Sequence, residues 1–387
     1  MTYAAHRRIF DVDSHLFELD DFLDNAARPE HRGKFPAMSE QTALPVVEAA
    51  LERGRELFAK RQNDPAVMAK FEAMMMDNRK SGWSRLGAFD SAERSHTLDL
   101  LGFEMQCVLP TFAFHQVAHV KDHDVLEAGA YTLNKAMGDF CSPDERLKAI
   151  GYLPLSLGPQ RAGEIMDQGP KDGCFSFMVD TNEPADDKLS FTHPDFDAVW
   201  ARFADLQLPF TVHVAVNGDY SAVSPSFRNN GKSSFELGGD APTGELGLQT
   251  IGQSAQLFLS AMIYDGVFER HPNLQSICME HAASWLPSWL QQMDFTAGMF
   301  KRKREFSELP SETAKQRIKV SPFAGENVGW IIENVGPEML MFASDYPHPE
   351  GGRDPIAKFE ATMENCDQST MDAFYYGNMQ SVLNLPA

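Results

Sequence analysis

Residues 195–214 read DFDAVWARFADLQLPFTVHV and combine a helical pattern with a strand pattern. The segment Asp195–Leu206 has the periodicity of a helix, and the segment Pro209–Val214 is a nearly continuous apolar run. Runs of that kind are typical of strands buried on both faces of a parallel sheet. This stretch therefore predicts one helix–strand unit of an α/β fold.

The same alternation of strand-like runs with helical segments recurs along the chain. Eight strands separated by helices predict a (β/α)8 barrel, also called a TIM barrel. Because the seventh run is short, a doubly wound open sheet is the alternative. Besides Pro209–Val214, the expected strands are Arg8–Asp13, Met105–Pro110, Ala149–Leu153, Cys174–Val179, Ser276–Glu280, Ile318–Ser321 and Leu340–Ser344.

Composition narrows the classes of protein to which this chain can belong. It has 387 residues, of which 43% are hydrophobic, and this suits a globular protein with a large core. With 34 Lys+Arg against 55 Asp+Glu, the formal net charge of -21 disfavours nucleic acid and anionic membrane surfaces as partners. We also expect no transmembrane helix, because no apolar run is long enough to form one.

The N-terminal residues and the cysteines indicate a compartment. The start, MTYAAHRRIFDVDSH, passes from two arginines straight into an acid-containing strand, unlike a signal peptide. The five cysteines are scattered and include no CxxC pair, as expected of reduced thiols. We therefore expect a cytoplasmic protein.

Two segments between strands are longer than ordinary loops. Residues 21–98 include helix-like stretches, and residues 215–250 are rich in Gly, Ser and Asn. Both follow strands, and barrel enzymes carry lids and substrate contacts at the carboxyl ends of their strands. We expect one domain over residues 1–387, with an insertion at 21–98 and a long loop after the fifth strand.

Polar residues able to bind a metal or transfer a proton lie at the ends of four expected strands. Asp13 and His15 are two apart, so they share a face of the first strand. His213 ends the fifth strand, His281 follows the sixth, and Asp345 follows the eighth. In a barrel these ends meet at one mouth, where imidazoles and carboxylates with an open position would form a catalytic metal site.

Each of these residues, taken alone, also has a purely structural interpretation. Asp is a preferred helix cap, which would account for Asp13, and His213 could bond a carbonyl group in the core. Polar groups buried in apolar strands need partners, and four such cases at four strand ends favour a shared site. A barrel that has lost its chemistry and serves as a scaffold is the non-enzyme hypothesis, and the intact set of candidate ligands argues against it.

Further residues are candidates for contact with a substrate. His115 follows the second strand, and His348 lies three residues after Asp345. A substrate carboxylate could be bound by Arg353, with Arg85 and Arg94 as alternatives, because a guanidinium group binds carboxylates through two parallel hydrogen bonds.

Four motifs, in their order along the chain, resemble the amidohydrolase-related branch of the metal-dependent amidohydrolase superfamily. This branch includes aminocarboxymuconate-semialdehyde decarboxylase and the γ-resorcylate and 5-carboxyvanillate decarboxylases. The resemblance runs from Ile9 to about Leu385 and is weakest over residues 21–98. The motifs are DVDSH (11–15), FTHPDFDAVWARFADLQLPFTVHV (191–214), ICMEHAASWLPSWLQQMD (277–294) and MFASDYPHPEGG (341–352).

The resemblance implies roles for the residues that match these motifs. Asp13, His15, His213 and Asp345 fall on the family's metal ligands, and His281 falls on its acid–base histidine. Many relatives have His-x-His on the first strand where this chain has an acid, and the added carboxylate suits Mn²⁺ as well as Zn²⁺. The fourth strand, CFSFMV, has no lysine to form a carbamate bridge between two metals. We therefore expect one divalent ion per chain, Zn²⁺ or alternatively Mn²⁺.

The resemblance also implies an activity. It points to a metal-dependent non-oxidative decarboxylase that acts on an aromatic or dienoic acid. A hydrolase acting on an amide, a lactone or a C–C bond is the alternative, because the family uses the same ligands for hydrolysis. We expect a small-molecule substrate and a homodimer, since relatives commonly form dimers.

Overall fold

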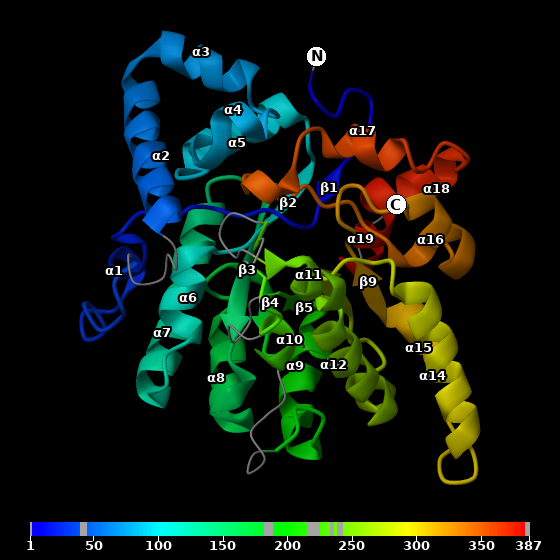
Figure 1. Ribbon diagram of the computed structural model, residues 1–387. Helices are drawn as coiled ribbons and strands as arrows, with labels where there is room; N and C mark the ends of the chain where they lie inside the picture. The colour runs from blue at the N-terminus through cyan, green and yellow to red at the C-terminus, as the bar shows by residue number, and fades with distance from the viewer. Residues whose placement is uncertain are drawn as a thin grey trace.

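Seven parallel strands form the central, curled sheet of the computed structural model, which describes residues 2–38, 45–181, 189–214, 225–232, 236–237 and 243–383 (Figure 1). A short antiparallel pair, β6 (Glu236–Leu237) and β7 (Thr243–Gly244), lies apart from it. Each of the first seven expected strands overlaps one strand of the central sheet. In sheet order these strands are β1 (Phe10–Asp11), β2 (Met105–Val108), β3 (Leu147–Leu153), β4 (Cys174–Val179), β5 (Phe210–His213), β8 (Ser276–Met279) and β9 (Ile318–Val320).

The segment expected as the eighth strand, Leu340–Ser344, lies between the two edges of this sheet. The backbone N–H of Met341 donates to the carbonyl of Val320 in β9, at 3.0 Å. On the other side, the N–H of Val12, next to β1, donates to the carbonyl of Phe342, at 3.1 Å. The pairing consists of isolated bridges rather than a regular ladder, so the expected strand has the right place but not the regular form.

Helices connect the strands and cover the sheet (Figure 1). Between β1 and β2 lie α1 (Phe22–Ala26), α2 (Pro45–Asn63), α3 (Pro65–Ala73), α4 (Asn78–Ser81) and α5 (Ser91–Leu101). The next connections contain α6 (Phe112–Ala118), α7 (His123–Cys141), α8 (Pro159–Gln168) and α9 (Asp197–Leu206). Between β5 and β9 lie α10 (Pro225–Arg228), α11 (Glu245–Thr250), α12 (Gln253–Tyr264), α13 (Val267–Arg270), α14 (Leu286–Phe300) and α15 (Pro310–Arg317). The C-terminal part contains α16 (Val328–Val335), α17 (Pro355–Glu360), α18 (Gln368–Asp372) and α19 (Asn378–Val382).

The helix predicted over Asp195–Leu206 shows how local sequence sets the boundaries of an element. Residues 194–196 form a 3-10 turn that begins with a proline, so α9 starts two residues later than expected, at Asp197. The helix ends at Leu206 because Gln207 adopts a left-handed conformation with φ 54°. Buried Val199, Trp200 and Phe203 then face the core.

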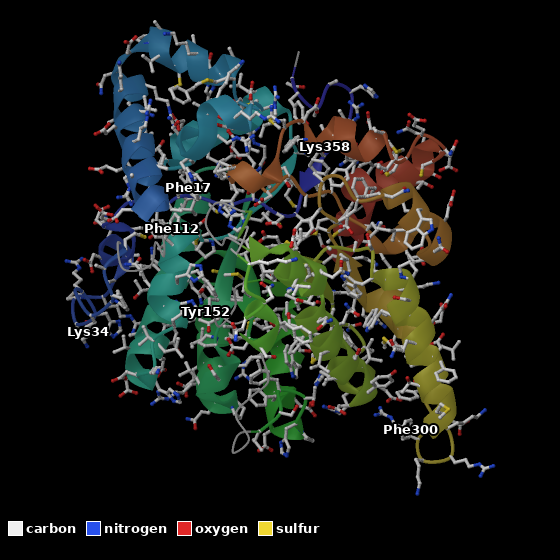
Figure 2. The ribbon with its side chains drawn as sticks, in the orientation of Figure 1. Phe17, Lys34, Phe112, Tyr152, Phe300 and Lys358 are labelled. Carbon is white, nitrogen blue, oxygen red and sulfur yellow. The ribbon has the colours of Figure 1, made fainter. Side chains whose placement is uncertain are left out.

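The helices between β1 and β2 pack through a second apolar cluster against the segments that follow β1 and β2. Figure 1 shows α2, α3, α4 and α5 gathered at one end of the molecule. Phe17 and Phe112, labelled in Figure 2, belong to this cluster, and their ring centroids are 6.4 Å apart. Buried Arg61 of α2 also binds Glu93 of α5 through two hydrogen bonds of 2.5 and 2.7 Å. These helices are therefore anchored by both apolar and charged contacts.

Two sequence expectations outside the sheet can be compared with the structure. The five cysteines are all free, which agrees with reduced thiols. Among the described residues, no helix is both long and apolar enough to cross a membrane. Much of the expected long loop at residues 215–250 lies outside the described residues.

Buried Asp11 joins three separate segments of the sheet. Its Oδ1 accepts from the backbone N–H of Ser344 at 2.8 Å, and its Oδ2 accepts from the Ser344 hydroxyl at 2.6 Å. The side-chain amide of Gln106 in β2 donates to the same Oδ2 at 2.8 Å. Burial raises the pKa of Asp11 to about 7, and these donors oppose that rise. Asp11 thus holds β1 to β2 and to the segment that follows β9.

Replacing Asp11 by Ala should lower the free energy of unfolding by about 3 kcal/mol, since each buried donor left without an acceptor costs roughly 1–3 kcal/mol. The variant no longer buries a carboxyl group, and this partly offsets the cost of the donors left without an acceptor. The expected loss of stability is therefore smaller than the sum of those costs. Urea denaturation followed by circular dichroism measures the change. Asp205→Ala, at an exposed position of α9, is the control. An Asp11→Ala protein as stable as this control would contradict the proposed role.

Candidate metal centre

The two residues expected on the first strand lie just after β1. Asp13 and His15 are each only 2% exposed. Residue 15 is fixed in place by its backbone, because its N–H donates to the carbonyl of Tyr346 at 2.7 Å. The Oδ1 of Asp13 lies 3.3 Å from Nε2 of His15, so both polar atoms point to one place.

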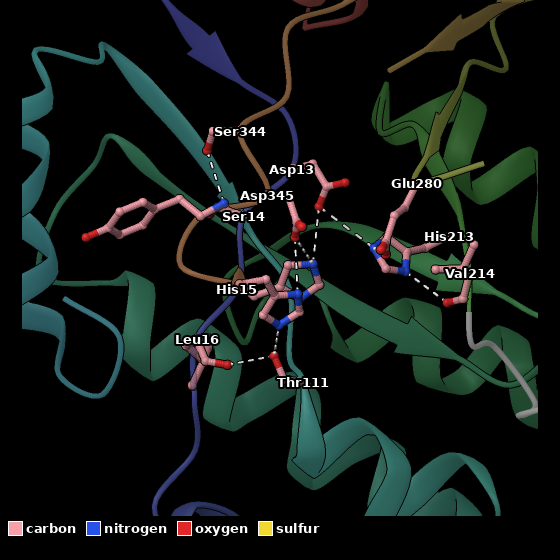
Figure 3. Close-up of polar contacts among 12 residues, drawn as sticks. Asp13, Ser14, His15, Leu16, Thr111, His213, Val214, Glu280, Ser344 and Asp345 are labelled. Atoms are coloured by element: carbon pink, nitrogen blue, oxygen red, sulfur yellow. Dashed lines mark hydrogen bonds and ion pairs between the residues drawn. The ribbon is translucent and has the colours of Figure 1, made fainter. Parts of the chain in front are cut away.

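His213, at the end of β5, adds a second imidazole. Its Nδ1 donates to the carbonyl of Val214 at 2.9 Å, which leaves Nε2 as the nitrogen that faces Asp13 (Figure 3). The distance from this Nε2 to Oδ1 of Asp13 is 3.8 Å. Ligand atoms of Asp13, His15 and His213 all lie within 4.8 Å of one another, close enough to hold one metal ion.

Asp345 and His348 form a second group with His15, and their ligand atoms also lie within 4.8 Å of one another. Asp345 has a left-handed backbone with φ 52°, and its Oδ1 lies 3.7 Å from Nε2 of His15. His15 is therefore shared by the two groups. The structure does not place Asp13 and Asp345 in a single group, although both approach the same nitrogen.

His348 is oriented by a chain of hydrogen bonds. The hydroxyl of Thr111 donates to the carbonyl of Leu16 at 2.8 Å, so its oxygen accepts from Nε2 of His348 at 2.9 Å. This directs Nδ1 of His348 toward Oδ1 of Asp345, 3.1 Å away. The ring of His348 also stacks on that of His15, with centroids 3.9 Å apart.

Buried polar atoms without hydrogen-bond partners indicate that the site fits a cation. These atoms include Oδ1 of Asp13 and the Nε2 atoms of His15, His213 and His281. Unpartnered buried polar atoms are rare in proteins, because each costs free energy. Imidazole nitrogens and carboxylate oxygens together form a donor set that suits Zn²⁺ and Mn²⁺.

Burial and neighbouring charges shift the pKa values of these groups in different directions. Burial lowers the pKa of both His15 and His281 to about 4, which favours the neutral form that a metal ligand requires. Burial alone would also lower the pKa of His213, but Asp13 and Glu280 outweigh it and raise the pKa to about 9. Burial opposes ionisation of Asp13, yet its contacts with the two histidines lower its pKa.

His281 lies beside these groups but belongs to neither. It is fully buried, and its Nδ1 donates to the carbonyl of Ile251 at 2.8 Å, so its Nε2 is the remaining polar atom. The residue before it, Glu280, was not among the candidate site residues predicted from the sequence. The Oε2 of Glu280 lies 3.4 Å from Nε2 of His213.

The other expected substrate-binding residues lie outside both groups. His115 stacks on His119, with ring centroids 5.0 Å apart. Arg353 is half exposed and lies 3.4 Å from Asp77. Arg94 is used structurally, since it donates to the carbonyls of Gly87 and His15.

Comparison with known proteins identifies the class. The amidohydrolase family model matches residues 11–385, and the chain therefore belongs to the amidohydrolase family, whose superfamily is metal-dependent. This confirms the resemblance drawn from the sequence.

Solved structures share this fold at low sequence identity. An amidohydrolase from Mycobacterium avium subsp. paratuberculosis has a TM-score of 0.73 at 19% identity, with 99% of each chain covered. The 5-carboxyvanillate decarboxylase from Novosphingobium aromaticivorans, complexed with manganese and 4-hydroxy-3-methoxy-5-nitrobenzoic acid, has a TM-score of 0.65 at 16% identity, with 99% of this chain and 98% of that one covered. The 2,6-dihydroxybenzoate decarboxylase from Rhizobium has a TM-score of 0.63 at 14% identity, covering 98% and 99%.

Proposed function

We propose that this protein is a metal-dependent non-oxidative decarboxylase of an aromatic or dienoic acid. The observation that carries the proposal is the contact between Asp345 and His348, placed beside the metal-binding atom of His15. Decarboxylation requires a proton that can be delivered to carbon, and we assign this role to the pair because it lies next to the candidate cation site. Two of the solved structures similar in fold are decarboxylases of aromatic acids, which supports the same assignment.

In this proposal, Asp13, His15, His213 and Asp345 hold one divalent ion. When bound, such an ion would attract the anionic oxygens of the substrate and offset negative charge that develops as the C–C bond breaks. The two carboxylates, and the manganese in a related structure, favour Mn²⁺ over the Zn²⁺ preferred from sequence.

The chain's own residues would then handle the proton. Asp345 delivers a proton to the carbon that bears the carboxylate, and that carbon's bond to CO₂ breaks. The new C–H bond forms from an electron pair of the substrate's π system, and the electron pair of the broken bond to CO₂ restores that system. Asp345 then regains a proton through His348. His281 presents Nε2 to a substrate oxygen and fixes the substrate's orientation.

Hydrolysis of an amide, a lactone or a C–C bond is the second candidate. This candidate is supported by the solved structure described as an amidohydrolase from Mycobacterium avium subsp. paratuberculosis, whose fold is similar over nearly the whole chain. In this case Asp345 or His281 would accept a proton from water instead of giving one to carbon. A non-catalytic scaffold is disfavoured, because every candidate ligand position carries a residue able to bind metal.

We also propose that the fold is a complete (β/α)8 barrel in one domain, with residues 21–98 as an insertion. The backbone hydrogen bonds of Met341 and Phe342 support it, since they join the segment Leu340–Ser344 to both edges of the sheet. A single domain is supported by the second apolar cluster, because it joins α2 to Phe17 and Phe112, which follow β1 and β2. A homodimer and a cytoplasmic location stay predictions.

Incubation with a panel of hydroxylated aromatic carboxylates, dienoic acids, amides and lactones tests the reaction. The protein is stripped with a chelator and reloaded with Mn²⁺, and products are identified by mass spectrometry. We expect a product lighter than its substrate by CO₂, formed only by the reloaded protein. Products heavier by one water would favour the hydrolase.

A further inference from the structure

The backbone after β8 is strained where the chain enters the site. Glu280 has φ 58° and Ala282 has φ 56°, and both values lie in the left-handed region. Side chains that carry a Cβ rarely adopt this region, and such strain tends to collect at functional sites. A glycine at position 280 would remove the strain, so the presence of glutamate calls for a reason.

The left-handed turn changes where the Glu280 side chain points. In a continued strand, neighbouring residues face opposite sides, so Glu280 would point away from the side of His281. Instead, its Oε2 lies 3.4 Å from Nε2 of His213, from the side opposite Val214 and near the candidate metal centre (Figure 3). The Glu280 side chain is only 20% exposed.

The contact between Glu280 and His213 has the length expected for two ligands of one ion, although in this structure Glu280 stands outside the group formed by Asp13, His15 and His213. The Nδ1 of His213 is occupied by the carbonyl of Val214, so Nε2 is the atom that faces carboxylates on both sides. Two ligands that each lie about 2.1 Å from one ion are separated by roughly 3.0–3.5 Å at angles near 90–110°. The Glu280 contact, at 3.4 Å, meets this spacing, and the Asp13 contact, at 3.8 Å, is slightly longer.

We infer that Glu280 is a further ligand of the divalent ion, which it reaches beside His213. This inference rests on the proposed metal centre of Asp13, His15, His213 and Asp345. The strained turn is then the means by which the chain brings a third carboxylate to the ion.

A third carboxylate changes which divalent ion the site prefers. Zn²⁺ sites in proteins are mostly four-coordinate and rich in nitrogen or sulfur, whereas Mn²⁺ accepts more oxygen ligands. A glutamate added to two aspartates therefore favours Mn²⁺. Removal of Glu280 should weaken Mn²⁺ binding more than Zn²⁺ binding.

Two variants at position 280 test the inference on chelator-stripped protein without reference to activity. Glu280→Gln keeps the size and the backbone but loses the anionic ligand, and should bind Mn²⁺ at least about tenfold more weakly, measured by electron paramagnetic resonance titration. Glu280→Gly should show the same loss of affinity, while its metal-free melting temperature rises because the strain is relieved. Glu305→Gln, at an exposed position, is the matched control.

The outcomes separate this inference from the proposed function. Unchanged Mn²⁺ affinity in Glu280→Gln, with affinity lost in His213→Ala, would overturn the Glu280 assignment alone. Unchanged affinity in both variants would overturn the metal centre itself. A lower metal-free melting temperature in Glu280→Gly would show that the turn serves stability, and would contradict the argument from strain.

Discussion

Asp345→Asn is expected to turn over substrate at least about a hundredfold more slowly than the unmodified protein, the low end for loss of a general acid–base group. The substitution keeps the size of the side chain and one acceptor oxygen, so substrate affinity should change little. The group that passes a proton to or from the reacting atom is lost, and so is the carboxyl group that contacts Nδ1 of His348 at 3.1 Å. Single-turnover kinetics on the substrate found in the panel measures the effect.

Metal content must be measured in the same Asp345→Asn samples, because Asp345 also approaches His15 at 3.7 Å. Asp205→Asn, exposed on α9, removes a charge without touching the site and should keep the normal rate. A metal-loaded Asp345→Asn protein with a near-normal rate would remove Asp345 from the chemistry and leave the fold assignment unchanged.

Replacing His213, at the end of β5, and replacing His281, two residues after β8, are expected to have different effects on metal content and activity. His213→Ala should lose both the metal and the activity, because Nε2 of His213 lies in the group with Asp13 and His15. His281→Ala should keep most of its metal and lose most of its activity, because His281 belongs to neither group. The loss in His281→Ala should be roughly a hundredfold or more, as for other acid–base groups.

Metal analysis by mass spectrometry, paired with activity on the same samples, separates the two roles. His271→Ala is the matched control, since His271 contacts Asp197 at the start of α9, at 3.4 Å, and lies in neither group. Equal loss of metal in His213→Ala and His281→Ala would show that the division of roles is wrong.

The strands could be predicted because their signal is local. A strand buried on both faces, such as Cys174–Val179, has apolar side chains at nearly every position. This pattern can be recognised from the adjacent residues alone. The segment Leu340–Ser344 was placed correctly but lacks a regular ladder. Its pairing depends on Val320 and Val12, which the local sequence does not specify.

Candidate site residues could be predicted from the sequence where they stood two residues apart or at the end of an apolar strand. Asp13 and His15 were paired by their spacing of two, and His213 by its place at the end of an apolar strand. Asp11 was missed because its partner, Ser344, is 333 residues away. The partnership of Thr111 with His348 spans 237 residues and was missed for the same reason.

Glu280 was missed for a different reason. It stood beside His281 in a quoted motif, but neighbours in a regular strand face opposite sides, so the motif gave no reason to pair the two residues. Its left-handed backbone breaks that alternation, and a non-glycine residue with positive φ leaves no signature in the sequence. A glutamate directly before a strand-end histidine was the only available signal.

The number of divalent ions bound per chain is the sharpest test of the proposed metal centre. Asp13 and Asp345 both approach Nε2 of His15, and Asp13 also approaches Nε2 of His213, so we propose a single ion shared by these four residues. Inductively coupled plasma mass spectrometry on active protein, normalised to chain concentration, should give one divalent ion per chain. Two ions per chain, or none in a preparation that still turns over substrate, would rule out the proposed single-ion centre.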